Sequence, residues 1–173
     1  MSGEEQEATF RRWLDDHLGL MLKVVRTCAA TPEDQEDLFQ DVLLQLWSSV
    51  PAFRGEAKET TWIYRVALNT ALAWQRQETK RRTRQTPLLA FKELPGTGDN
   101  AGQIEQEEIV ARLYAAIQQL PRVDAALVLL YLDDLSYREM AEVLGISESN
   151  VGVKLNRARK ALGELMKEAA YES

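Results

Sequence analysis

The polar and basic side chains between residues 149 and 160 could read double-stranded DNA. Lysine and arginine can donate hydrogen bonds to guanine edges or phosphates, and asparagine suits adenine in the major groove. These residues fall mainly off an apolar stripe with helical spacing, so most of them would share an exposed helix face. The stripe comprises Val151, Leu155, Ala158, Leu162 and Leu165. The candidate DNA-reading residues are Ser149, Asn150, Lys154, Asn156, Arg157 and Lys160.

A second cationic cluster lies between Arg76 and Arg84, with five basic residues and one acidic residue. Tyr64 and Trp74 precede it on the same expected helix. Aromatic rings stack on unpaired bases while cations contact phosphates. The pattern therefore favours nucleic acid over a merely solvated helix end whose cations suit the helix dipole.

Acidic residues gather between Glu33 and Asp41, where there are five acids and no base. Acids stabilise the first turn of a helix, which leaves Asp41 and its neighbours Gln40, Leu44 and Gln45 unexplained. Two interpretations remain open, a stabilised helix start and a partner-binding face.

Catalysis is not expected. His17 is the single histidine and Cys28 the single cysteine, and the chain has no Gly-rich phosphate loop, metal-ligand cluster or nucleophile elbow. We therefore expect no catalytic residues, metal, cofactor or small-molecule substrate. The acidic N-terminal segment lacks a hydrophobic stretch, and no apolar run approaches the ~20 residues that span a bilayer. A cytoplasmic location is expected, and the net charge of −6 restricts DNA contact to local patches.

The elements that must position these residues are all helical. Apolar residues recur at three- and four-residue spacing, and Ser136 to Glu139 forms a capping-box sequence. Gly145 suits the left-handed position that ends the short helix and begins a helix-turn-helix. In the first part of the chain, helices are expected at residues 4–28, from the start signal at Thr31 to Pro51, and from a cap at Thr60 or Thr61 to Arg84. In the second part, helices are expected at residues 103–119 and in three further segments that begin at Pro121, Ser136 and Ser147.

Prolines and glycines interrupt the helical pattern in residues 85–102, which predicts a flexible acidic linker. The predicted fold is therefore all-α, with two small helical domains at residues 1–84 and 103–173.

Two blocks of sequence, in the same order and joined by a variable linker, resemble the extracytoplasmic-function (ECF) group of bacterial sigma factors. Asp37 to Val42 with Leu46-Trp47 resembles the acidic helix of sigma region 2. Phe53-Arg54-Gly55, followed by Thr61 to Ala67 and Asn69, resembles the FRG…TWLYRIAxN block. Region 4 of the family is matched by Leu120-Pro121-Arg122, Leu135 to Ala141, and Asn150 to Lys160.

The resemblance implies a three- to four-helix region 2 bundle, a region 4 helix-turn-helix bundle, and a role in promoter-specific transcription initiation. The partners it implies are the clamp coiled coil and flap of core RNA polymerase, and promoter DNA. The residues of the −35 site would be the six candidate DNA-reading residues, Ser149, Asn150, Lys154, Asn156, Arg157 and Lys160. Core-binding residues would be Asp37, Gln40, Asp41, Leu44, Gln45 and Trp47. Residues that hold the −10 element would be Phe53, Arg54, Gly55, Glu56, Arg65, Asn69, Trp74, Arg76 and Arg81. Trp62 is expected in the core, and the linker would run through the active-site cleft of the polymerase.

The second helix of the predicted helix-turn-helix, which begins at Ser147, departs from the family at Gly152 and Val153, where a basic and a small polar residue are usual. The resemblance also implies an anti-sigma factor as partner, for which Leu44, Trp47, Leu129 and Leu132 are candidate contacts. Two alternatives are a sigma-like mimic that sequesters an anti-sigma factor and a helix-turn-helix repressor. The cations of the two basic segments argue against the mimic. Against a repressor, the first 84 residues show neither a two-fold interface nor a ligand pocket.

Overall fold

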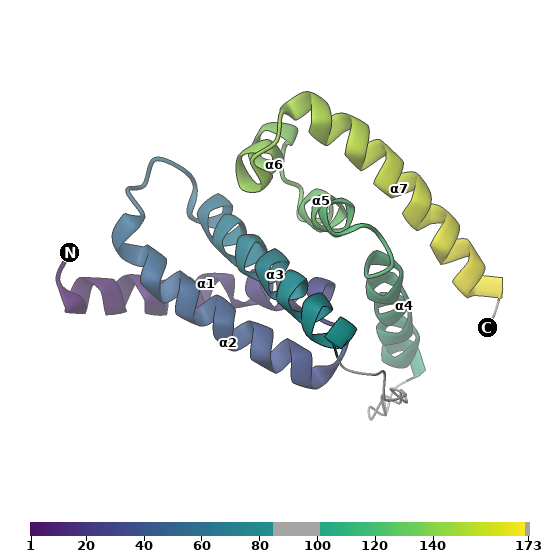
Figure 1. Cartoon of the computed structure of the whole chain (residues 1–173), viewed down its shortest axis with the longest axis horizontal. Coiled ribbons are helices and arrows are strands. Elements are labelled where there is room, and N and C mark those ends of the chain that lie inside the picture. The colour runs from purple at the N-terminus through teal and green to yellow at the C-terminus, as the bar shows by residue number, and fades with distance from the viewer. Residues whose placement is uncertain (85–100, 172–173) are drawn as a thin grey trace.

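The computed structural model describes residues 1–84 and 101–171, and these residues form seven α-helices and one short 3₁₀ turn (Figure 1). The expectation of an all-α fold is confirmed for this part of the chain. None of the described helices is long and apolar enough to span a membrane, and no group of potential metal ligands occurs among the same residues. The elements are α1 (Gly3–Cys28), α2 (Pro32–Ser49), η1 (Val50–Ala52), α3 (Glu59–Arg84), α4 (Ala101–Ile117), α5 (Arg122–Leu132), α6 (Tyr137–Leu144) and α7 (Glu148–Tyr171).

Helices α1, α2 and α3 pack on one another and form the N-terminal half. Ser2 begins α1 with a capping box, in which its hydroxyl accepts from the Glu5 backbone N–H and its own N–H donates to the Glu5 carboxylate. Thr31 caps α2 in a similar way, with a hydrogen bond from the Asp34 N–H, and Pro32 occupies the first turn. The expected cap at Thr60 or Thr61 is wrong, because α3 already begins at Glu59.

Helices α4 to α7 form the C-terminal half, in which α6 and α7 make the helix-turn-helix. Ser136 caps α6 with the expected capping box. Gly145 then takes a left-handed backbone conformation, with a φ of 66°, that residues other than glycine rarely adopt. The chain turns there into α7. Val151, Leu155 and Ala158 of the predicted stripe are buried, and Leu162 and Leu165 are half-buried.

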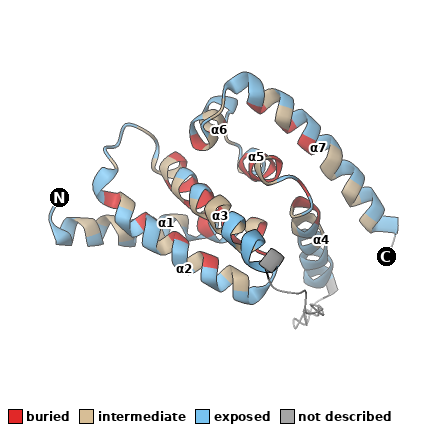
Figure 2. Ribbon diagram, in the orientation of Figure 1, coloured by how far each residue is buried: buried red, intermediate tan, exposed pale blue. Residues whose placement is uncertain are grey.

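The two halves lie side by side, with α5 against α1 and α6 against α3 (Figure 1). One continuous core contains Leu38 and Ile63 from the N-terminal half together with Leu127, Leu130 and Met140 from the C-terminal half. Residues 124–130 of α5 are all buried, so this helix is covered on every side (Figure 2). The sequence did not predict this contact between halves, and the predicted linker lies almost wholly outside the described residues. Only its last two residues are described, and they begin α4.

Polar contacts also join the halves at what we call the Asp133 junction, formed by Lys23, Tyr64 and Asp133. The Tyr64 hydroxyl donates to Asp133 Oδ2, and Lys23 Nζ lies 2.5 Å from Asp133 Oδ1. Burial and the neighbouring carboxylate raise the pKa of Tyr64, which therefore stays a hydrogen-bond donor. Asp133 ends α5 and thus fixes that helix to both α1 and α3.

A second polar contact between the halves joins Lys58, before α3, to Glu139 of α6, with 2.6 Å between Nζ and Oε1. The ammonium group, together with the N–H of Ser136, holds the pKa of Glu139 below its ordinary value. Glu139 therefore serves both the cap of α6 and the packing of that helix on the N-terminal half.

Candidate nucleic-acid interface

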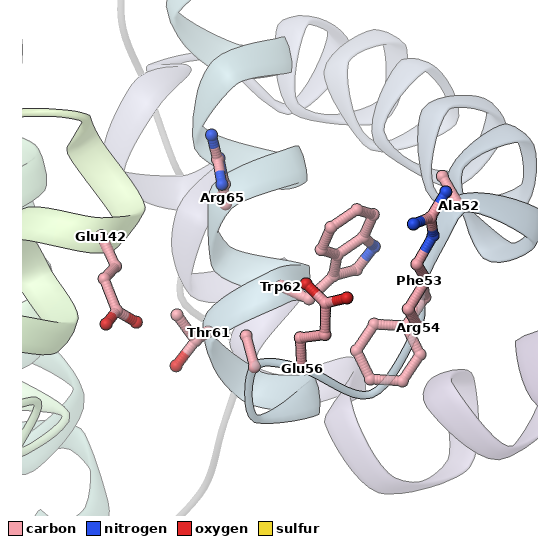
Figure 3. A pocket seen from close by; sticks show the side chains of 9 residues that line it. Ala52, Phe53, Arg54, Glu56, Thr61, Trp62, Arg65 and Glu142 are labelled. Atoms are coloured by element: carbon pink, nitrogen blue, oxygen red, sulfur yellow. The ribbon is translucent and has the colours of Figure 1, made fainter.

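The loop between η1 and α3 forms one wall of a cavity of about 530 Å³. Four of the residues predicted for the −10 element line it, namely Phe53, Arg54, Glu56 and Arg65. Figure 3 shows Arg54 and Glu56 on the loop side, Trp62 and Arg65 on α3, and Glu142 of the C-terminal half across the opening. Cations beside an aromatic ring can hold an unpaired base and its phosphate.

Aromatic packing holds this loop in place. Phe53 meets Trp13 edge to face at 5.4 Å between ring centroids and Trp62 at 5.6 Å. Gly55 then turns the loop through a left-handed conformation, with a φ of 73°. Because buried Trp13 is part of the main core, Phe53 fixes the loop to the body of the N-terminal half.

Trp62 packs against the main core, as the sequence suggested, but it is not fully buried there. Its ring is half-buried and lines the cavity, and its indole N–H donates to Ser49 Oγ at 3.2 Å. Sequence reasoning missed both Trp62 and Glu142 as residues of this site. Trp62 offered a signal, since it directly precedes other residues of the family block, whereas the approach of Glu142 depends on the packing of α6 on α3.

Asn69 and Trp74 lie apart from this cavity. They line a separate groove of about 440 Å³ between α2 and α3, together with Asp41 and Gln45. The structure thus places two residues predicted for the −10 element beside two predicted for core binding. Arg76 and Arg81 are exposed further along α3, where Arg81 is 3.2 Å from Glu78.

The predicted core-binding residues of α2, which we call the acidic face, are all exposed. They lie opposite the buried Leu38, Val42 and Leu46. Leu44 is 63% exposed, and Trp47 is 37% exposed while one edge of its ring meets Phe10. Large exposed apolar side chains, and an exposed tryptophan in particular, are typical of a protein interface. The exposed members of the predicted core-binding set are Asp37, Gln40, Asp41, Leu44, Gln45 and Trp47.

Most of the predicted −35 residues lie on the outer face of α7. Arg157 also has a partner within the chain, because its Nη2 lies 3.0 Å from both carboxylate oxygens of Asp124. Asp124 is buried in the first turn of α5, whereas the Arg157 side chain is 62% exposed. Lys154 is half-buried, and the exposed members of the set are Ser149, Asn150, Asn156, Arg157 and Lys160.

The two residues that depart from the family, Gly152 and Val153, lie differently on α7: Gly152 is half-buried at the edge of the outer face, and Val153 is on the outer face itself. A Cβ added to Gly152 would sit 3.5 Å from Cε2 of Tyr137, so the tyrosine ring of α6 covers the glycine. Val153 is 72% exposed. At Gly152 the cation that is usual in the family is missing, and the Tyr137 ring packs beside the glycine.

We expect Gly152→Ala to raise the free energy of unfolding by about 1 kcal/mol, because glycine in a helix interior is less stable than alanine by that amount. The added methyl would make an ordinary van der Waals contact with Tyr137. Urea unfolding measures the change. Gly163→Ala is the matched control on the same helix, where a Cβ meets nothing within 4 Å. A loss of stability in Gly152→Ala alone would mean that the Tyr137 ring cannot accommodate the methyl.

Comparisons with known proteins match both halves. Residues 13–81 match the family model for sigma-70 region 2, and residues 111–162 match that for sigma-70 region 4. The RNA polymerase sigma-H factor of Pseudomonas aeruginosa is 31% identical over 168 residues, which cover 88% of this chain and 83% of that protein. The ECF RNA polymerase sigma factor SigM of Mycobacterium tuberculosis is 28% identical over 158 residues, with 91% of this chain and 74% of that protein covered.

Solved structures share the fold. The sigma factor RpoE of Bartonella quintana, in complex with the anti-sigma factor NepR, superimposes with a TM-score of 0.70 at 18% identity. The match covers 92% of this chain and 97% of that one. CnrH, in complex with the cytosolic domain of CnrY, gives a TM-score of 0.65 at 20% identity.

Proposed function

The chain belongs to the ECF group of RNA polymerase sigma factors, and we propose that three of its surfaces divide the work of promoter-specific transcription initiation in the cytoplasm. The observation that carries the proposal is the coexistence, on one chain, of a cation- and tryptophan-lined cavity, a helix-turn-helix and an exposed acidic face. The chain would act as a subunit of the polymerase, with no reaction of its own.

The cavity beside the η1–α3 loop would receive an unstacked base of the −10 element. Arg54 and Arg65 would contact phosphates, and Trp62 would offer a ring for stacking. Extrusion of a base into a pocket lets a protein recognise sequence in a strand that is being opened. Gly55 would shape the loop, and Asn69, Trp74, Arg76 and Arg81 would guide the strand along α3.

The outer face of α7 would enter the major groove of the −35 element by its N-terminal part, as in other helix-turn-helix proteins. Asn150 and the exposed cations of this face would supply base and phosphate contacts. Arg157 would act there while tied to Asp124, which fixes the direction of its guanidinium group. Region 4 would also contact the flap of the polymerase.

The acidic face of α2 would bind the clamp coiled coil of core polymerase. An anti-sigma factor would compete for the same exposed apolar residues, Leu44 and Trp47, and for Leu132, which is 49% exposed. Leu129 was expected to contribute, but that expectation is wrong because the residue is 3% exposed.

Asp41→Ala should weaken binding to core polymerase about five- to tenfold, which corresponds to roughly 1 kcal/mol lost at the interface. Titration of core enzyme with a fluorescently labelled chain measures the dissociation constant. Asp16→Ala removes the same charge from the exposed face of α1 and serves as the control. Both variants should keep the melting temperature of the wild type.

Run-off transcription completes the test, since promoter-directed transcripts should require both this chain and core enzyme. Tight binding of the free chain to a duplex promoter, with nothing added by core enzyme, would contradict the proposal and support a repressor instead.

A further inference from the structure

Val153 is the most exposed large apolar side chain in the interior of any described helix, at 72%. Single exposed apolar residues are common on protein surfaces, so exposure alone carries no function. Its position is what matters. Val153 follows Asn150 by one helical turn and precedes Arg157 by another, so the three residues lie along one side of α7.

The surroundings leave the valine accessible to a flat surface. Gly152 has no side chain, and the Tyr137 ring of α6 fills the space beside it. Lys154 is half-buried on the other flank. The N-terminal part of the recognition helix therefore presents a branched apolar group between polar neighbours, at the place where such helices meet base edges.

The major groove offers one apolar group among its base edges, the C5-methyl group of thymine. Every other feature on those edges is a donor or acceptor that a valine would desolvate without replacement. We propose that Val153 recognises a thymine in the −35 element through its C5-methyl group. The inference rests on the proposed −35 role of α7 and assigns a specificity-determining contact within it.

The test uses holoenzyme and a promoter taken from a library randomised in the −35 region. Each −35 thymine, on either strand, is replaced in turn by deoxyuridine, which lacks only the methyl group. For one of these positions, the wild-type holoenzyme should bind the substituted promoter about three- to fivefold more weakly than the unsubstituted promoter. This is the effect expected for the loss of one buried methyl contact. The Val153→Ala holoenzyme should show a smaller loss at that position, because the alanine side chain is shorter and offers less apolar surface to the methyl group.

Alanine is a better helix former than valine, so Val153→Ala should fold at least as well as the wild type. Val110→Ala is the matched control, because Val110 is also exposed, at 39%, but lies on α4. The positions at which deoxyuridine weakens binding should be the same for Val110→Ala as for the wild type. Replacement of a thymine by deoxyuridine in the DNA between the −35 and −10 elements should affect the binding of none of the three proteins.

Identical profiles for the wild type and Val153→Ala would overturn the inference. So would a defect of Val153→Ala in binding core polymerase with unchanged DNA binding, which would assign the valine to a protein contact. If the promoters selected from the library show no preferred sequence in the −35 region, the −35 role of α7 itself would be overturned. Failure of the Val153 inference can therefore be distinguished from failure of the proposed function.

Discussion

Arg157→Ala is expected to lower the free energy of unfolding by about 1–3 kcal/mol, because it leaves the Asp124 carboxylate buried without its cation. Loss of one partner from a fully buried pair removes about 3–5 kcal/mol. We expect less here because the Arg157 side chain is 62% exposed, so water already reaches the pair. The N-terminal turn of α5 also supports the carboxylate that remains. For a chain of this size, each kilocalorie shifts the melting temperature by about 2–4 °C.

Two further variants separate this effect from DNA binding. Lys160→Ala removes an exposed cation from the same helix and should leave stability near that of the wild type. Asp124→Asn combined with Arg157→Ala should recover part of the loss, because no charge is then buried. Arg157→Ala should also weaken −35-dependent binding by about 1–3 kcal/mol if the guanidinium group contacts a base. Equal stability of Arg157→Ala and Lys160→Ala would show that the ion pair is of no structural consequence.

Asp133→Ala is expected to weaken the attachment of the two halves by about 1–3 kcal/mol, because the buried Tyr64 hydroxyl loses its acceptor and Lys23 loses its partner. Small-angle X-ray scattering should record a larger radius of gyration. Energy transfer between dyes on Glu56→Cys and Ser149→Cys should fall. Burial raises the pKa of Cys28 to about 12, so dyes should react selectively with the introduced thiols.

The neighbouring residue supplies the control for this variant. Asp134→Asn removes the same charge, and asparagine tolerates the left-handed conformation that Asp134 adopts, with a φ of 59°. Tyr64→Phe should act in the same direction as Asp133→Ala, and the double variant should show less than the sum of the two effects. An unchanged scattering profile in Asp133→Ala, Tyr64→Phe and the double variant would mean that the Asp133 junction does not hold the halves together.

Local signals in the sequence predicted the helices, apart from the start of α3, and the turn of the helix-turn-helix. The Ser136 capping box and Gly145 act through neighbours a few residues away, so their effect can be read from spacing alone. The exposure of the acidic face of α2 was equally accessible, since Leu38, Val42 and Leu46 mark the buried side.

Contacts between distant segments were not predictable in the same way. Asp124 lies in the first turn of α5, where acids are common, and nothing near it in the sequence indicates Arg157, 33 residues later, as its partner. The Asp133 junction joins three helices, and Trp62 and Glu142 share a cavity only because α6 packs on α3. Each of these depends on how helices cross, which helical periodicity does not specify.

The position of Glu142 in the wall of the cavity has a thermodynamic consequence for the free chain. If a base enters the cavity only after α6 moves away, the measured affinity equals the intrinsic affinity multiplied by the fraction of molecules already open. With roughly one molecule in a hundred open, single-stranded DNA would bind about a hundredfold more weakly than the cavity itself allows. By the same linkage, any partner that binds only the open form would raise the affinity for the strand without touching it.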